Sequence, residues 1–139
     1  MSYPASWQGM EQMTPVSFLA SFLAPLQPGS QFRENMTLQV MALLTPATLD
    51  EFLQFNLQDI QQAQYKAETP RPCTLGDSPG YSCQYAGQMN PMIPIPLRFL
   101  GVFTIRGNRA YSLRYTARAE QYDTYSGTVD KMIASVHLL

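Results

Sequence analysis

The sequence predicts an α+β fold in which antiparallel strands form a sheet flanked by helices. Three observations support this: a hairpin pattern over residues 97–116, a capped amphipathic helix that begins after Thr48, and an amphipathic helix that closes the chain. The chain has 139 residues, of which 45% are hydrophobic, so it has the size of one domain with one core. We therefore expect a single domain over residues 1–139.

The closing hairpin gives the most detailed prediction. Residues 97–106 and 109–116 have the pattern of two strands, and the Gly-Asn pair at 107–108 suits a two-residue turn. That turn sets a register in which Arg106 faces Arg109. Apolar residues fall on both faces of this hairpin, so we expect the sheet to be covered, at least in part, on both sides.

Shorter signals predict the other elements. Thr48 is a suitable N-cap and Glu51 follows three residues later, which forms a capping box for a helix that ends near Gln64. The final helix carries an apolar stripe from Tyr122 to Val136. Strands are expected over residues 3–7, 16–23, 36–44, 65–75 and 81–86.

Composition argues against several classes of function. The net charge is −1 with no run of Lys or Arg, which disfavours a nucleic-acid-binding protein. No apolar run is long enough for a membrane span, and the first residues lack the pattern of a signal peptide. His137 is the single histidine, so a multi-histidine metal site is excluded. We expect no enzyme, no metal and no cofactor.

Cys73 and Cys83 form the sharpest local hypothesis. If residues 76–80 form a five-residue turn, the flanking strands pair Cys73 with Cys83, within reach of a cross-strand disulfide. The alternative is two buried free thiols in a reducing compartment.

The segment over residues 87–96 is predicted to be a loop, because three prolines in six residues disfavour a place inside a sheet. Methionine adapts to varied surfaces and proline reduces the entropy lost on ordering, so this loop is a candidate docking site. The alternative is a loop folded back over a sheet edge. The candidate partner-binding residues in it are Met89, Pro91, Met92, Ile93, Pro94 and Ile95.

Arginines gather near the closing hairpin. Arg106 and Arg109 lie at its tip, while Arg98 and Arg114 are expected to share a face. Such a set suits the carboxylates of a protein partner. The alternative is a solvated polar edge.

Three pieces of the chain match a known pattern. Tyr3-Pro4 with Trp7 gives a Tyr-Pro-x-x-Trp opening, and residues 35–40 followed by 48–52 give a central strand and first helix. The third piece is the closing hairpin with its helix, carried by residues 99–116 and then Tyr122, Tyr125, Val129, Lys131 and Ile133.

In this order the pieces resemble the PsbP-like fold of the photosystem II extrinsic proteins, their relatives and a family of Ran-binding import factors. The resemblance implies an α/β/α sandwich and a non-enzymatic, protein-binding accessory or assembly role, with a photosynthetic or other membrane complex as one such partner. It favours an extracytoplasmic location, the thylakoid lumen or periplasm. The alternative is a small-ligand carrier, or a chaperone for apolar segments, with a pocket between sheet and helix. The two cysteines lie outside the family pattern, and no metal-binding or photosystem-docking residue can be carried over.

Overall fold

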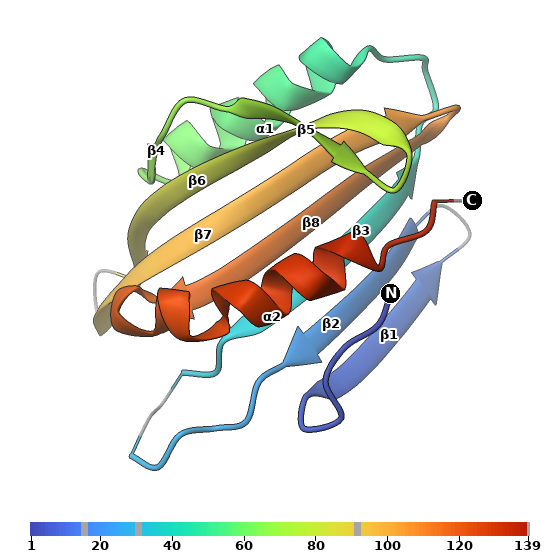
Figure 1. Cartoon of the computed structure of the whole chain (residues 1–139). Coiled ribbons are helices and arrows are strands. Elements are labelled where there is room, and N and C mark those ends of the chain that lie inside the picture. The colour runs from blue at the N-terminus through green and yellow to red at the C-terminus, as the bar shows by residue number, and fades with distance from the viewer. Residues whose placement is uncertain (15–16, 30–31, 91–92, 139) are drawn as a thin grey trace.

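The computed structural model describes residues 1–14, 17–29, 32–90 and 93–138. Eight strands form one antiparallel sheet with the order β1-β2-β3-β8-β7-β6-β4, and β5 also pairs with β6. Figure 1 shows this strongly twisted sheet with one long helix on each side. The antiparallel α+β fold predicted from the sequence is confirmed.

The strands are β1 (Gln8–Thr14), β2 (Ser17–Leu23), β3 (Asn35–Ala42), β4 (Lys66–Ala67), β5 (Arg71–Leu75), β6 (Ser78–Asn90), β7 (Ile93–Arg106) and β8 (Arg109–Arg118). The helices are α1 (Leu49–Gln62), α2 (Tyr122–Ala134) and a short 3-10 turn at Ala119–Gln121.

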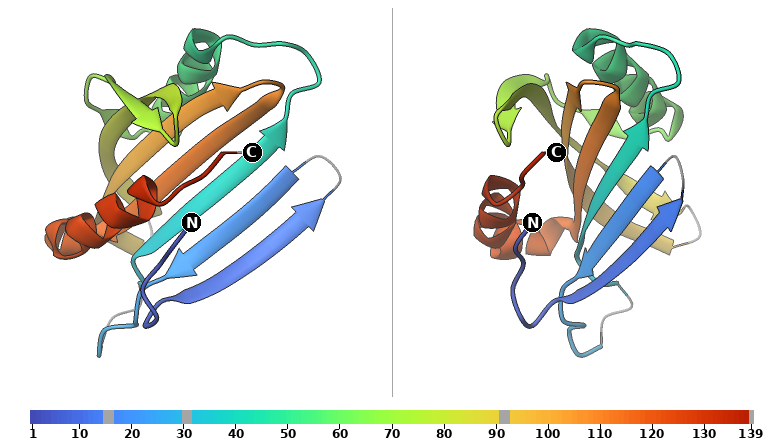
Figure 2. Two further views of the ribbon diagram at one scale, coloured as in Figure 1. Left: turned by 45° about the vertical axis from the view of Figure 1, so that its right-hand side comes forward. Right: turned by 90° about the vertical axis from the view of Figure 1, so that its right-hand side faces the viewer.

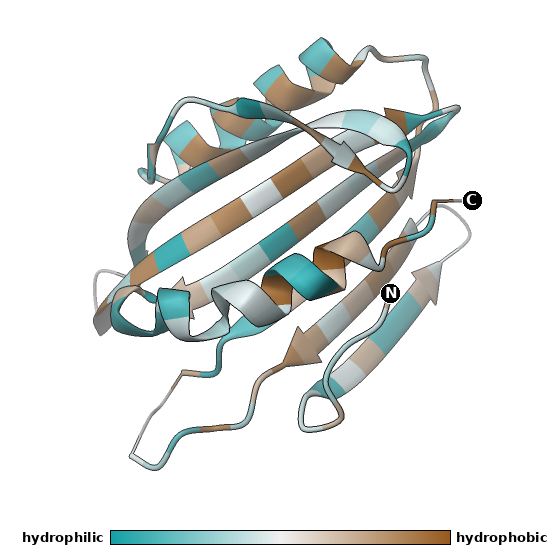
Figure 3. Ribbon diagram, in the orientation of Figure 1, coloured by the Kyte–Doolittle hydropathy of each residue, from teal (hydrophilic) through white to brown (hydrophobic). Residues whose placement is uncertain are grey.

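The two helices cover opposite faces of the sheet (Figure 2). Helix α2 lies on one face together with the N-terminal segment, and α1 lies on the other face over β6 and β7. Figure 3 shows apolar and polar residues alternating along parts of the strands. Successive strand residues point to opposite faces, so this alternation is expected where the two faces differ in environment. Helix α1 lies at the β4–β6–β7 side of its face, so the part of this face nearer β2 and β3 is left open.

Helix α1 begins where its capping box predicts. The Glu51 amide donates to Thr48 Oγ1 at 3.1 Å, and the Thr48 amide donates to Glu51 Oε1 at 3.1 Å. Phe52 and Leu53 are buried in one cluster with Phe103, and the rings of Phe52 and Phe103 pack edge-on with centroids 6.1 Å apart. The helix ends at Gln62, two residues before the predicted end.

The larger core lies under α2. Buried residues of β3 and β8 form its floor and buried residues of α2 its roof; they include Met36, Leu113, Tyr115, Val129 and Met132. This cluster explains the apolar stripe of the final helix, which packs against the sheet as predicted.

The register of the closing hairpin is as predicted. Arg106 pairs with Arg109 and Val102 with Leu113, around a turn in which Gly107 takes a φ of 62°. That left-handed conformation favours glycine, and so the Gly-Asn turn sets the pairing of β7 with β8.

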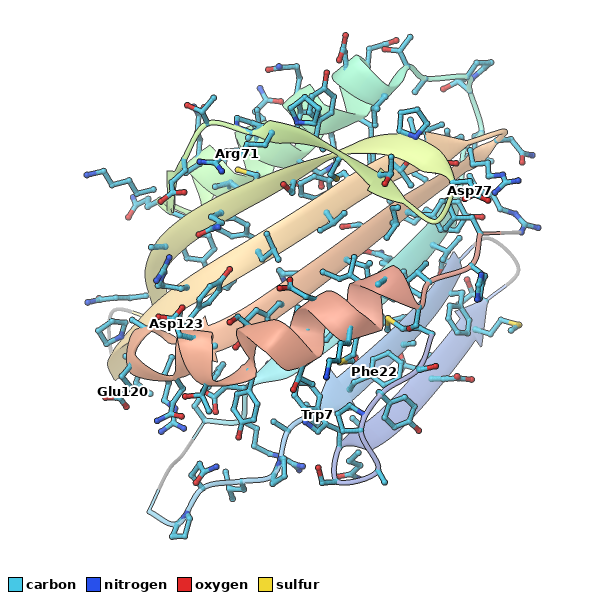
Figure 4. The ribbon with its side chains drawn as sticks, in the orientation of Figure 1. Trp7, Phe22, Arg71, Asp77, Glu120 and Asp123 are labelled. Carbon is cyan, nitrogen blue, oxygen red and sulfur yellow. The ribbon has the colours of Figure 1, made fainter. Side chains whose placement is uncertain are left out.

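The first strand is not where the sequence predicted it. Residues 3–7 form no strand; β1 follows them, and all of its residues are exposed. An exposed edge strand needs no apolar alternation, which is why the pattern gave no sign of it. Trp7 instead packs into the core beside α2, edge-on to Tyr125 with ring centroids 5.6 Å apart (Figure 4).

Candidate functional site

An apolar groove opens between the sheet and the tail that follows α2. Its volume is about 460 Å³. The half-buried side chains of Phe18, Leu38 and Val40 form its floor, and the tail residues Val136 and Leu138 form one wall. These five side chains come from β2, β3 and the C-terminal tail, so only the folded chain brings them together.

The groove exists because the cover of this face stops short. Helix α2 ends at Ala134. The N-terminal segment covers another part of the face, where Tyr3 packs on Phe22 with ring centroids 4.6 Å apart. Between these covers, Leu38 and Val40 are only half-buried.

Two contacts hold the tail that forms the wall. Arg106 Nη1 donates to the Leu138 carbonyl oxygen at 3.4 Å. The Leu138 side chain also lies against Gly76 at the β5–β6 turn, where a Cβ would come within 3.1 Å of it. The wall is therefore tied to two hairpin turns that are distant in sequence.

Strand β1 borders the groove and is an edge of the sheet. It pairs with β2 on one side, without a register break over Gln8–Thr14, and no other strand of the described residues lies beside it. Met13 is 79% exposed and lies at the groove, and Glu11 is the one charged residue of the strand. An edge with neither lysine nor proline nor bulge offers its backbone groups to an added strand.

The predicted arginine tip reaches this groove only in part. Arg109 lines the groove together with His137, whereas Arg106 holds the tail. The other expected pair is separated: the register places Arg98 on the α2 face and Arg114 on the α1 face. Arg98 stacks over the Tyr122 ring at 4.4 Å.

The predicted loop at 87–96 is wrong in its secondary structure. Strand β6 continues to Asn90 and β7 begins at Ile93, with a register shift between Gln88 and Asn90. Before Leu97, at residues 93–96, β6 is the one described strand that pairs with β7, since β8 ends at Arg118 opposite Leu97. A strand with one neighbour can keep its proline nitrogens on the unpaired side, so prolines are accepted here.

The predicted docking residues therefore belong largely to a two-stranded extension formed by the end of β6 and the start of β7. Ile95 packs against a cluster that includes Phe99 and Tyr85 instead of standing free. Met89, Ile93 and Pro94 belong to the two strands, and Pro91 and Met92 lie outside the described residues. Partner binding by these residues stays a prediction.

The predicted pairing of Cys73 with Cys83 is wrong. The turn is Gly76-Asp77 alone, so Leu75 pairs with Ser78 and Cys73 pairs with Gly80. Cys73 therefore packs toward the α2 face and Cys83 toward the α1 face, and both thiols are free. Burial raises the pKa of both thiols, which keeps them protonated and unreactive.

The described residues hold no cluster of three or more His, Cys, Asp or Glu side chains that would bind a metal ion. Within the same ranges, no helix is long and apolar enough to cross a membrane.

No protein-family model matches this sequence, and no curated protein matches it either. Solved structures do match. The cyanobacterial PsbP (CyanoP) of Synechocystis sp. PCC 6803 shares 14% identity at a TM-score of 0.67, over 99% of this chain and 84% of its own. The chain has the PsbP-like fold. The fold predicted from the three sequence motifs is thereby confirmed.

Two further structures share the architecture. PA94 of Pseudomonas aeruginosa, a protein of unknown function described as a putative regulator, matches at a TM-score of 0.74 and 12% identity, over 100% of this chain and 90% of its own. LpqN of Mycobacterium tuberculosis, which is involved in cell envelope biogenesis, matches at a TM-score of 0.66 and 9% identity, over 96% of this chain and 79% of its own. At these identities the likeness concerns the fold.

Proposed function

We propose that this protein is a non-enzymatic accessory or assembly factor that binds an apolar segment of a partner protein along β1 and in the groove. The single observation that carries the proposal is the junction of an open sheet edge with an apolar groove, joined at Met13. A segment added to an edge gains main-chain hydrogen bonds, and an adjacent groove for its side chains gives selectivity.

The groove favours an apolar segment over a charged one. Phe18, Leu38 and Val40 offer it an apolar floor, and Arg109 with His137 stands at the margin, where a polar flank of the segment would lie. A subunit of a photosynthetic or other membrane complex is a partner of this kind.

The location proposed for this role is extracytoplasmic. The involvement of LpqN in cell envelope biogenesis and the match to a cyanobacterial PsbP support this location by analogy of fold alone.

A second candidate function uses the same groove. Its volume of about 460 Å³ falls within the range of small-ligand pockets, so a carrier of a small apolar molecule is the alternative that we weigh against it. The two functions differ in occupant, which decides the experiment.

Site-specific photocrosslinking tests the proposal. A photoreactive p-benzoylphenylalanine at Phe18 in the full chain should crosslink, in an extract of the native source, to one protein through an apolar stretch mapped by mass spectrometry. The control places the same group at Phe55, an exposed aromatic on α1. Adding Val40→Glu should remove the Phe18 crosslink, since it puts a charge on the groove floor.

Two outcomes would overturn the partner-protein role. Crosslinks from position 18 to small molecules alone would support the carrier. Protein capture from position 18 no stronger than from position 55 would remove the groove as a docking site.

A further inference from the structure

A second cavity lies on the opposite face of the sheet, beside α1. It has a volume of about 530 Å³ and is formed by α1, the segment after it and the part of the sheet that α1 leaves open. Its lining differs from that of the apolar groove, because hydroxyl, amide and guanidinium groups dominate it. The proposed function does not use this cavity.

The strand register builds the cavity floor. One row across the sheet is Ser21, Thr37 and Arg114, and the adjacent row is Leu19, Gln39 and Ser112. This part of the face is open, and five of its six floor side chains are polar, so the floor offers hydrogen-bonding groups to a ligand in the cavity.

The cavity wall combines an aromatic cluster with one acid. Tyr65 and Tyr85 line the cavity with ring centroids 5.8 Å apart, and Tyr85 stacks on Phe99 at 4.6 Å, which fixes its ring. Helix α1 contributes Asn56 and Asp59. Donor and acceptor groups thus surround the space from α1, the segment after it and strands β2, β3, β6 and β8.

Arg114 is the cation of this lining. It lies exposed on the floor and forms no ion pair with any described residue. It lies beside the Tyr85 phenol, and burial raises the pKa of Tyr85 to about 12, an increase that the nearby Arg114 offsets only in part. The phenol therefore keeps its proton at neutral pH. Its O–H and the guanidinium N–H groups are donors for one anionic acceptor.

The charges of the lining limit the ligand. One guanidinium balances one negative charge, and Asp59 on the wall disfavours a second, so a monocarboxylate fits better than a phosphate or sulfate dianion. The hydroxyl and amide side chains of the floor suit a ligand with hydrogen-bonding groups beyond its carboxylate. We propose that the cavity binds a small monocarboxylate with hydroxyl or amide groups, and that Arg114 holds the carboxylate.

Calorimetric titration of the full chain tests this site. The probes are gluconate, glucuronate and glutamine, with sulfate as the dianion and glucose as the uncharged analogue. At least one carboxylate should bind, and more tightly than sulfate or glucose. Arg114→Gln should weaken that binding by about tenfold to a hundredfold, because it removes a charge-assisted hydrogen-bonding pair. Arg114→Lys should weaken it less, since the charge remains.

Arg71→Gln is the matched control, because Arg71 is an exposed residue of β5 outside the cavity lining, so removal of this equal charge should leave carboxylate binding unchanged. Circular dichroism and the Tm of each variant check its fold. Carboxylate binding that survives Arg114→Gln intact would contradict the proposal, as would tighter binding of sulfate. Native mass spectrometry of the protein from its source covers other acids: absence of any bound carboxylate there, together with no binding of the three probes, would also overturn it.

Discussion

The Glu34 carboxylate is the most deeply buried charge among the described residues, at 0% exposure. Arg118 donates to it from Nε at 2.9 Å, from Nη2 at 3.0 Å and from its backbone amide at 3.1 Å. The pair joins the start of β3 to the end of β8. Burial raises the pKa of Glu34, but the hydrogen bonds and charge of Arg118 outweigh burial, so the net pKa lies below the ordinary 4.5.

This lowered pKa predicts a pH dependence of stability. A carboxyl group with a lower pKa in the folded state contributes its full stabilisation above the unfolded pKa, 4.5, and loses it as pH falls through the folded pKa. The free energy of unfolding, measured by urea titration between about pH 5 and about pH 2, should therefore fall less steeply in Glu34→Gln than in wild type.

Glu120→Gln is the control for that measurement. Glu120 is 73% exposed and lies 3.8 Å from Arg118, so this variant should keep the wild-type pH slope. Equal slopes for wild type and Glu34→Gln would contradict the ion-pair account.

At the scale of the element, two glycines predict opposite effects of the same substitution. A Cβ at Gly80 would collide with the Phe103 carbonyl oxygen of β7, so Gly80→Ala should lower the free energy of unfolding by about 1–3 kcal/mol. Gly127 lies exposed in α2 with open space around it, so Gly127→Ala should raise it by about 0.5–1 kcal/mol. Denaturant unfolding of both variants checks the pair; a neutral Gly80→Ala would argue against the β6–β7 register.

Gly80 also shows where local sequence reasoning fails. Both hairpins carry turn residues, but Gly107-Asn108 has strand patterns close on either side, whereas Gly76 begins a run of five turn formers. If Gly80 belonged to that turn, Cys73 would pair with Cys83; in the structure the turn is shorter and Cys73 pairs with Gly80. Gly80 is needed instead for close approach of β6 to β7, a tertiary requirement that no local pattern reveals.

The apolar groove and the polar cavity were harder to predict from the sequence than the strands. The polar alternation of Thr37 and Gln39 was visible in the sequence, and the structure explains it as the floor beside α1. Which part of each face stays open depends on where α1, α2 and the tail end against the sheet. That depends on packing between distant segments, so the apolar groove and the polar cavity appear only in three dimensions.

At the scale of the whole molecule, the two ends of the chain meet on the α2 face. The Ser2 amide donates to Ser135 Oγ at 2.7 Å, and Trp7 packs edge-on to Tyr125. The N-terminal segment thus belongs to the same core as α2 and the sheet. The N-terminal segment leaves the groove uncovered and contacts β1, which borders the groove. The stability of this segment therefore affects the proposed binding surface.

Trp7 is the single tryptophan, so its fluorescence reports how this segment packs. If residues 1–139 form one cooperative domain, the urea midpoint from Trp7 fluorescence should equal the midpoint from far-UV circular dichroism. Tyr125→Leu, which removes the ring that faces Trp7, should lower both midpoints together. A fluorescence transition at clearly lower urea would mean that the N-terminal segment detaches first, and β1 would then lose one of the contacts that position it beside the groove.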